Sequence, residues 1–303
     1  MSKKHTQRSN GGLADCNSQA HRGRVKEVFG FDCYSPKEIA ERVENVGVTK
    51  ANLPLLSQAA LGVLAGGFIG LGAMFFTLVV SDASLSFAVA RVLGGVVFSL
   101  GLILVVVAGA ELFTGNNLLV MATVAGRIPP SRFLQNMFVI YVANLVGAVG
   151  LAALVASSGH WQMGGSAVGK TALGIAAAKC ALPFSEAFFK GVLCNVLVCL
   201  AVWLAMAGRT VTDKVLAIVF PITAFVACGF EHSVANMYFI PLGIFLEQQL
   251  ASVANNASLS WFGFARNLLP VTLGNIIGGA GMVGLVYWII YRRNTASIPS
   301  SHA

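Results

Sequence analysis

The sequence predicts an all-α membrane protein with six apolar segments, in two halves that cross the bilayer in opposite directions. Of its 303 residues, 56% are hydrophobic and 11% are charged, and the mean hydropathy is +0.76. Soluble proteins carry about 25% charged residues, so the composition indicates a polytopic membrane protein. Two further observations indicate the halves: the second and fifth apolar segments are both interrupted by polar residues, and the interruptions share one spacing.

Each apolar segment is long enough to span a bilayer, for which about 20 apolar residues suffice. The segments cover residues 53–80, 85–125, 133–156, 185–207, 215–245 and 268–291. The second is too long for one ordinary span and too short for two spans with a loop between them. It therefore predicts two half-helices joined by an irregular turn. Between the third and fourth segments, a loop rich in small residues is predicted at 157–183.

Both interruptions place a carboxylate and an amide inside the membrane. Gly109 and Gly229 each begin the spacing Gly-x-Glu-x-x-x-x-Asn, displaced from one another by 120 positions. Ionisable residues at that depth indicate a functional site, and irregular backbone is tolerated there only where protein buries it or it lines a cavity. An inverted repeat with one broken helix in each half predicts a pathway between the breaks. Four side chains are expected to anchor the broken backbone: Glu111, Glu231, Asn116 and Asn236.

Shorter echoes support the repeat. The stretch GVLA at 62–65 in the first segment resembles GVLC at 191–194 in the fourth, and the pattern Asn-x-x-Gly begins at Asn144 in the third segment and at Asn275 in the sixth. Glycines also recur at every fourth position of the first segment, which allows close helix contact either within a subunit or between subunits: Gly62, Gly66 and Gly70.

The charge pattern predicts the topology. We expect a cytoplasmic N-terminal tail at 1–51, a transmembrane channel domain at 52–292 and a cytoplasmic C-terminal tail at 293–303. The N-terminal tail is basic and lacks the apolar core of a signal peptide. Basic residues also mark the loops at 127–132 and 209–214 and the C-terminus, so the positive-inside rule places both termini in the cytoplasm. The expected location is the plasma membrane, which in bacteria is the inner membrane.

One short amphipathic helix is predicted within the N-terminal tail. Ser35 is the expected N-cap, Pro36 the first helical position and Glu38 the residue that completes a capping box. The helix is expected to run to about Val46, with Gly47 as its stop. It fits either a solvated helix beside the membrane or a plug that gates the pore.

Several classes of protein are not expected. The net charge of +8 does not indicate nucleic-acid binding, because the basic residues gather in the tail and in short loops. The six cysteines share no ligand spacing, so neither a disulfide framework nor a metal site is supported, and no cofactor is expected. Nor is the chain expected to be an enzyme, since it carries no zinc-protease or nucleophile motif. It also lacks the paired Asn-Pro-Ala motifs of a water channel and the paired pore histidines of an ammonium channel.

The polar residues near the breaks are candidates for a substrate pathway. His232 is the one histidine predicted inside the membrane, where imidazole can change its charge near neutral pH; a buried histidine that only satisfies hydrogen bonds is the ordinary alternative. Thr114, which faces it by the pseudo-symmetry, and Asn195 offer uncharged donors that orient a small anion without trapping it. Lys179 either concentrates anions by electrostatic steering or is an ordinary interfacial lysine.

Large apolar side chains near the breaks fit constrictions that stop hydrated ions. Packing or lipid contact is the ordinary alternative for such residues in a membrane helix. The candidates are Phe98, Leu102, Phe113 and Phe225.

The chain resembles the formate/nitrite transporter family over about residues 52–291. The matching stretches are GAELFT (109–114), GVLCNVLVCLAVW (191–203), GFEHSVANM (229–237) and PVTLGNIIGG (270–279). The resemblance implies an aquaporin-like protomer, five protomers in a ring and one pore in each. It implies that His232 and Thr114 are the central pair, that Asn195 lines the pore and that Lys179 is the vestibule cation. It also implies two constrictions, one of Phe98, Leu102 and Phe225 and the other of Leu112, Phe113 and Val198. The predicted N-terminal helix corresponds to the segment proposed to gate the cytoplasmic mouth in some members.

The expected function is therefore transmembrane conduction of small monovalent anions of weak acids, with protons as a possible coupled partner at His232. Formate, nitrite and hydrosulfide members share this framework. Phe230 and the stretch YFIP at 238–241 are similar to formate members, whereas LFTG at 112–115 and FFKG at 188–191 are similar to nitrite members. Formate is the favoured substrate, and nitrite or hydrosulfide is the alternative.

Overall fold

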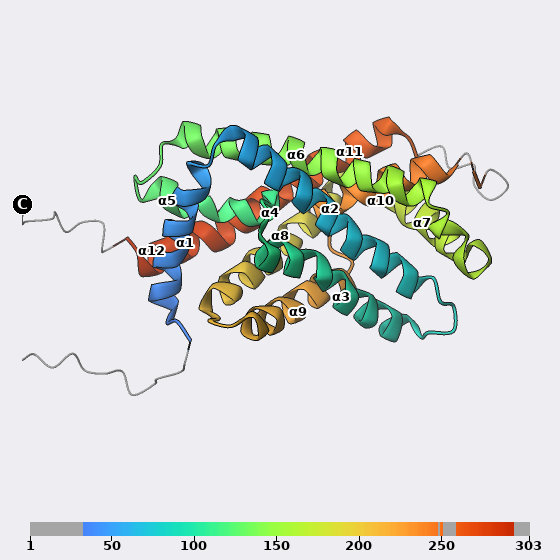
Figure 1. The fold of residues 1–303 in the computed structure, drawn as a ribbon, viewed down its shortest axis with the longest axis horizontal. Helices are drawn as coiled ribbons and strands as arrows, with labels where there is room; N and C mark the ends of the chain where they lie inside the picture. The colour runs from blue at the N-terminus through green and yellow to red at the C-terminus, as the bar shows by residue number, and fades with distance from the viewer. Residues whose placement is uncertain (1–32, 248, 251–258, 294–303) are drawn as a thin grey trace, which may run out of the picture. The chain divides into compact units, whose positions relative to one another are not determined.

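The computed structural model describes residues 33–247, 249–250 and 259–293, and every regular element within these ranges is helical. Five helices there are long and apolar enough to cross a membrane, and a shorter apolar helix covers Ser233–Glu247. Figure 1 shows them packed as one bundle.

The second half of the chain repeats the order of elements in the first half. The first half comprises α1 (Pro36–Ala51), α2 (Leu55–Val80), α3 (Phe87–Ile103) with its π-helical continuation η1 (Leu104–Gly109), α4 (Phe113–Asn116), η2 (Asn117–Leu119), α5 (Val120–Val124) and α6 (Pro130–Ser157). The second half comprises η3 (His160–Gln162), α7 (Met163–Ala181), α8 (Phe184–Ala207), α9 (Val211–Ala227), α10 (Ser233–Glu247), α11 (Trp261–Ile276), η4 (Ile277–Leu285) and α12 (Val286–Tyr291). The breaks follow η1 and α9, which confirms the predicted fold class, an aquaporin-like six-segment bundle with an inverted repeat and broken second and fifth segments.

The segment at 157–183, predicted as a loop, is mostly helical. Gly164, Gly165 and Ser166 have positive φ angles of 58°, 62° and 68°, which interrupt the start of α7. The rest of α7 is rich in alanine, the residue with the highest helix propensity. The prediction was wrong because small residues suggest a loop when their neighbours in the fold are unknown. α7 precedes α8 as α1 precedes α2, so each half begins with an additional helix.

The N-terminal helix α1 begins as predicted and ends later. The Ser35 hydroxyl accepts a hydrogen bond from the backbone N–H of Glu38, and the Glu38 carboxylate accepts one from the backbone N–H of Ser35. Gly47 lies inside the helix, which continues to Ala51. Packing explains this glycine, because an added Cβ would lie 3.2 Å from the Cβ of Ala122 on α5.

A buried carboxylate binds α1 to the bundle. Glu44 is 1% exposed and accepts two hydrogen bonds of 3.0 Å from the guanidinium of Arg292, just after α12. Arg127, just after α5, places its Nη1 3.6 Å from the same carboxylate. Buried charges persist where they are paired and hydrogen-bonded. α1 therefore packs on α5, α8 and α12, as Figure 1 shows for α1, α5 and α12, and is not a solvated helix.

The glycine stripe of α2 serves contact within the subunit. A Cβ at Gly62 would collide with the Cβ of Ala143, and a Cβ at Gly66 with the backbone carbonyl of Asn144, both on α6. A Cβ at Gly147 on α6 would likewise collide with the carbonyl of Val63 on α2. The pairing of α8 with α11 repeats this arrangement through Gly191, Gly274 and Gly278. The two helices of each pair thus come close enough for a side chain on one helix to hydrogen-bond the backbone of the other.

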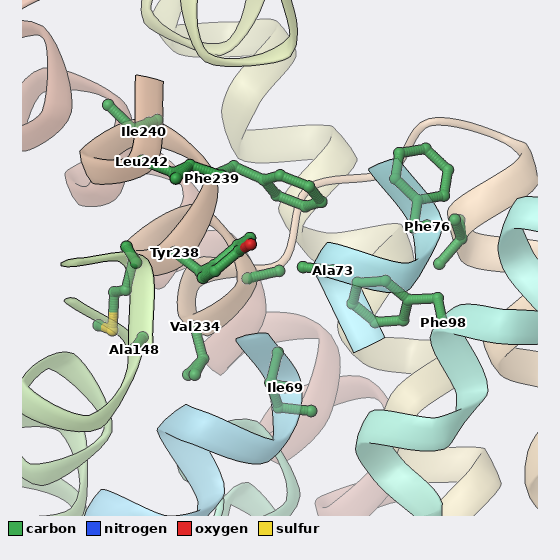
Figure 2. Packing of buried hydrophobic residues seen from close by; sticks show 14 of the residues in the cluster. Ile69, Ala73, Phe76, Phe98, Ala148, Val234, Tyr238, Phe239, Ile240 and Leu242 are labelled. Carbon is green, nitrogen blue, oxygen red and sulfur yellow. The ribbon is translucent and has the colours of Figure 1, made fainter. Parts of the chain in front are cut away.

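The helix α10 forms the centre of the core. Every residue from Ser233 to Gly243 is buried, and a helix that is apolar on all sides belongs inside a bundle. Figure 2 shows Tyr238 and Phe239 of α10 beside Ile69 and Phe76 of α2. The rings of Phe76 and Phe239 pack edge to face, with centroids 6.0 Å apart. The two halves therefore meet across α2 and α10.

Gly66→Ala should destabilise the protein by about 1–3 kcal/mol or prevent its folding, because the added methyl group overlaps the Asn144 carbonyl on α6. Gly67→Ala is the matched control, since nothing lies within 4 Å of its added Cβ. Thermal unfolding midpoints of the detergent-purified variants measure the difference. Equal midpoints for the two variants would contradict close contact between α2 and α6.

Candidate functional site

Each broken helix stops at a glycine with a left-handed backbone. Gly109 has φ of 90° and Gly229 has φ of 72°, a conformation that costs glycine little. The residue after each glycine closes the preceding turn: Ala110 N–H donates to the Val105 carbonyl at 2.9 Å, and Phe230 N–H donates to the Phe225 carbonyl at 3.0 Å. The two breaks therefore have matching geometry.

The side chain of Asn144 satisfies three backbone groups at the first break. Its Oδ1 accepts a hydrogen bond of 2.9 Å from Phe113 N–H. Its Nδ2 donates to the carbonyls of Gly62 and Glu111, at 2.7 and 2.9 Å. Backbone polar groups buried among apolar helices need such partners, because no water is available to replace the helical bonds.

Asn275 does the same at the second break. Its Oδ1 accepts from Ser233 N–H at 2.9 Å, and its Nδ2 donates to the carbonyls of Gly191 and Glu231, at 2.8 and 3.0 Å. Asn144 and Asn275 are fully buried. The Asn-x-x-Gly echo of the sequence thus marks the side chains that hold the breaks.

The glutamate of each break is paired with a lysine from the additional helix of the same half. Lys179 Nζ on α7 lies 2.8 and 3.0 Å from the two carboxylate oxygens of Glu231. Lys50 Nζ on α1 lies 3.1 Å from the Glu111 carboxylate. Both glutamates are 5% exposed. Since a buried charge is costly unless paired, each lysine neutralises the carboxylate that its break contains.

Buried amides complete each ion pair. Asn236 Nδ2 donates to Glu231 at 2.6 Å and to Asn267 Oδ1 at 2.7 Å, and Asn267 donates to the Lys179 carbonyl. In the first half, Asn116 Nδ2 donates to Glu111 at 2.7 Å and to Asn136 at 3.0 Å. These networks hold the predicted anchor residues in place.

A vestibule opens beside each ion pair. The Lys179 vestibule is a cavity of about 260 Å³ whose lining includes Lys179, Glu231, His232, Phe98 and Phe225. The Lys50 vestibule, of about 490 Å³, has a lining that includes Lys50, Glu111, Leu102 and Leu112. The two cavities share none of their lining residues.

His232 and Thr114 meet in the buried region between the vestibules. Nε2 of His232 lies 3.0 Å from the Thr114 hydroxyl oxygen, and Nδ1 accepts a hydrogen bond of 3.1 Å from Ala235 N–H. Because Nδ1 is an acceptor, the ring hydrogen is assigned to Nε2. The imidazole stacks on Phe225 with centroids 5.9 Å apart, and Phe225 packs edge to face on Phe98 at 5.6 Å. A hydrogen-bonding pair therefore adjoins an apolar barrier.

Asn195 hydrogen-bonds the backbone next to this pair. Its Nδ2 donates to the carbonyls of Thr114 and Asn275, at 3.3 and 2.6 Å, and it lines neither vestibule. Its Oδ1 is buried without a hydrogen-bond partner among the described residues. Cys199 Sγ lies 3.4 Å from the same Thr114 carbonyl.

The predicted constriction residues separate into three places. Phe98 and Phe225 line the Lys179 vestibule, and Leu102 and Leu112 line the Lys50 vestibule. Phe113 and Val198 are buried and line neither vestibule; the Phe113 ring packs against Tyr141 at 4.8 Å.

Sequence reasoning missed three polar residues of the site. Lys50 was assigned to the tail, although it precedes Lys179 by 129 positions, the displacement that also relates Gly62 to Gly191. Asn136 and Asn267 share the displacement of 131 that relates Asn144 to Asn275. Repeated displacement was thus the signal that could have found them.

Membrane-length helices, two broken segments and a vestibule on either side of a buried polar pair define a membrane transport protein of the aquaporin-like class. The family model described as formate/nitrite transporter matches residues 37–289. The chain belongs to the formate/nitrite transporter family, which confirms the resemblance drawn from the sequence motifs.

Individual relatives agree with this assignment. The formate channel FocA of Escherichia coli (strain K12) is 41% identical over 274 residues, which are 87% of this chain and 96% of the relative. FocA of Haemophilus influenzae is 41% identical over 263 residues, covering 83% of this chain and 92% of the relative. A solved structure, a pentameric formate channel with formate bound, has a TM-score of 0.74 at 38% identity and covers 78% of this chain and 97% of that one. These relatives are channels and not enzymes.

Asn144→Asp should lower stability by several kcal/mol, because it removes two buried hydrogen bonds and places a carboxylate against two carbonyl oxygens, and each unsatisfied buried group costs about 1–3 kcal/mol. Asn45→Asp makes the same chemical change at an exposed position of α1 and should be nearly neutral. Thermal unfolding of the purified protein compares them. Equal stability of both variants would show that Asn144 does not hold the break.

Proposed function

We propose that the chain conducts small monovalent anions of weak acids through a pore in each protomer, and that formate is its substrate. The observation that carries the proposal is the His232–Thr114 pair between two vestibules. The relatives support formate, since both FocA proteins are described as formate channels and the solved pentamer holds formate. Nitrite is the alternative on the same framework.

The pair offers hydrogen bonds without a full charge. Thr114 and His232 are 0% and 2% exposed, so an anion beside them has lost most of its water. An imidazole N–H and a hydroxyl replace part of that hydration, whereas a fixed cation would bind the anion too tightly for release, and conduction needs binding weak enough to leave. The neighbouring rings of Phe98 and Phe225 exclude larger hydrated ions.

His232 could donate a proton to the anion or stabilise it directly as a neutral hydrogen-bond donor, and the hydrogen bond at Nδ1 favours the second role. Proton donation to the anion needs an imidazolium, with a second hydrogen on Nδ1. That hydrogen would face Ala235 N–H across 3.1 Å, so two donors would oppose each other at the start of α10. His232 therefore acts as a neutral donor that stabilises the anion directly. Coupling to protons would require this bond to break first.

The proposed assembly and orientation are supported by the family and by the charges. The protomers form a homopentamer in the plasma membrane, the bacterial inner membrane, as in the pentameric formate channel. Both termini face the cytoplasm by the positive-inside rule, so the Lys50 vestibule is the cytoplasmic mouth and α1 forms part of its wall. Lys179 lies in the outer mouth, and Asn195 holds the Thr114 carbonyl beside the pore.

His232→Phe should lower formate flux by about ten- to a hundredfold, since a hydrogen bond to a charged group contributes about 1.5–3 kcal/mol. His232→Asn keeps an N–H donor and should retain more flux, with the pH dependence of the original protein. Initial rates of radiolabelled formate uptake by proteoliposomes at several pH values measure both effects. The same assay with nitrite tests the alternative substrate.

His160→Asn, outside both vestibules, is the control for loss of a histidine and should leave flux unchanged. If His232→Asn instead abolishes flux as fully as His232→Phe and removes the pH dependence, His232 is a proton donor. If the original protein transports neither formate nor nitrite, the proposed function is wrong.

A further inference from the structure

The two vestibules are related by the repeat, so a difference between them indicates a specific role. At both breaks a helix ends inside the bundle, at Gly109 and at Ala227. The last turn of α9 contains the carbonyls of Val226, which also accepts from Gly229 N–H at 3.1 Å, and of Ala227; the positions displaced by 120 from them are Val106 and Val107. Such helix ends carry partial negative charge. An anion approaching either vestibule would therefore be repelled by the carbonyls unless a donor covers them.

Arg91 covers the carbonyls of one break. Its Nη2 donates to the Val226 carbonyl at 2.6 Å and its Nε donates to the Ala227 carbonyl at 3.0 Å. The position displaced by 120 from Arg91 is Val211, whose side chain has no hydrogen-bond donor. Among the described residues, no side-chain hydrogen bond reaches the carbonyls of Val106 and Val107. The repeat is therefore broken at Arg91.

The space around Gly229 and Gly109 also differs between the two breaks. A Cβ added at Gly229 would lie 3.1 Å from Nη2 of Arg91, whereas nothing lies within 4 Å of a Cβ added at Gly109. The Arg91 guanidinium also lies 5.7 Å from the ring centroid of Phe76. Figure 2 shows Phe76 beside Phe98, and both rings line the Lys179 vestibule, as Arg91 does. Backbone and ring contacts together hold the guanidinium in one position.

Arg91 also supplies the excess charge of its vestibule. Five titratable residues line this cavity: Arg91, Lys179, Lys190, Glu231 and His232. Glu231 balances Lys179, and Lys190 pairs with Glu186 at 3.3 Å. Within the described part of the chain, no carboxylate lies within 4.0 Å of Arg91. In the Lys50 vestibule, the lining cation Lys50 is balanced by Glu111.

We propose that Arg91 is the residue that concentrates anions in the Lys179 vestibule and makes the two mouths unequal. The inference rests on the proposed function and extends it to a residue outside the central pair. Lys179 lines the same vestibule, but Glu231 neutralises it, so the pair contributes little net electric field there. One uncompensated charge in a partly enclosed vestibule should raise the local concentration of a monovalent anion about three- to tenfold.

The first experiment measures flux of radiolabelled formate from each side, in right-side-out and inverted membrane vesicles at equal pH and zero potential. Arg91→Met should raise the half-saturating concentration about three- to tenfold from the Lys179 side with little change in maximal rate. At equilibrium, the ratio of maximal rate to half-saturating concentration must be the same from both sides. This ratio must therefore fall equally from the Lys50 side, where the fall should appear as a lower maximal rate. Arg91→Lys, which keeps the charge, should restore the original values.

Ionic strength separates an electrostatic role from a structural one. Raising it from about 0.01 M to about 1 M shortens the Debye length from about 30 Å to about 3 Å, and the original protein should then approach the Arg91→Met variant. Lys170→Met removes one exposed lysine of α7 that lines neither vestibule and should change nothing. A difference between original and variant that persists at high salt would overturn the proposal.

The second experiment does not depend on transport. Ala178→Cys places a thiol in the Lys179 vestibule, in a background where Cys16, Cys33 and Cys228 are replaced by serine. The ratio of its reaction rates with an anionic and a cationic methanethiosulfonate reports the local potential. Arg91→Met should lower this ratio about three- to tenfold, and Arg91→Lys should restore it. An unchanged ratio overturns the inference about Arg91, whereas a lowered ratio in a protein that conducts no formate overturns only the proposed function.

Discussion

The backbone of two helices stops inside an apolar bundle, and the rest of the site depends on how that backbone is hydrogen-bonded. Asn144 and Asn275 each bind one N–H and two carbonyls across three segments. These bonds require the neighbouring helices to approach to backbone contact, which is why glycines line the α2–α6 and α8–α11 interfaces. A larger side chain at those glycines would separate the helices and leave the breaks without partners.

The breaks also explain the additional helix at the start of each half. Glu111 and Glu231 accept hydrogen bonds from the amides that follow them, but a buried carboxylate needs a cation as well. α1 and α7 supply Lys50 and Lys179, and Glu44 fixes α1 through Arg292. The N-terminal helix is therefore part of the wall of the Lys50 vestibule. Since the lysines are neutralised, they stabilise the breaks more than they attract a distant anion.

The proposed function depends on where the symmetry ends. The hydrogen bonds of the two breaks are nearly the same, but His232 and Arg91 have no counterparts in the other half, where Leu112 and Val211 occupy the positions displaced by 120. A symmetric pair of breaks gives two similar vestibules and a buried centre. In the proposed pathway, the unmatched histidine supplies the hydrogen-bond donor at the centre, and the unmatched arginine makes the two mouths unequal.

The sequence by itself determined the six-segment fold, the broken second and fifth segments and the family, because these follow from apolar length and from local motifs repeated at fixed displacements. It singled out His232, Thr114, Glu111 and Glu231 as candidates because polar residues stand out within apolar segments. Only the tertiary structure showed that residues 157–183 form a helix, that Lys50 completes an ion pair and that Arg91 caps α9. The ion pair of Lys50 with Glu111 joins residues 61 positions apart, and Arg91 reaches carbonyls more than 130 positions away. No local pattern specifies which distant group a long flexible side chain will reach.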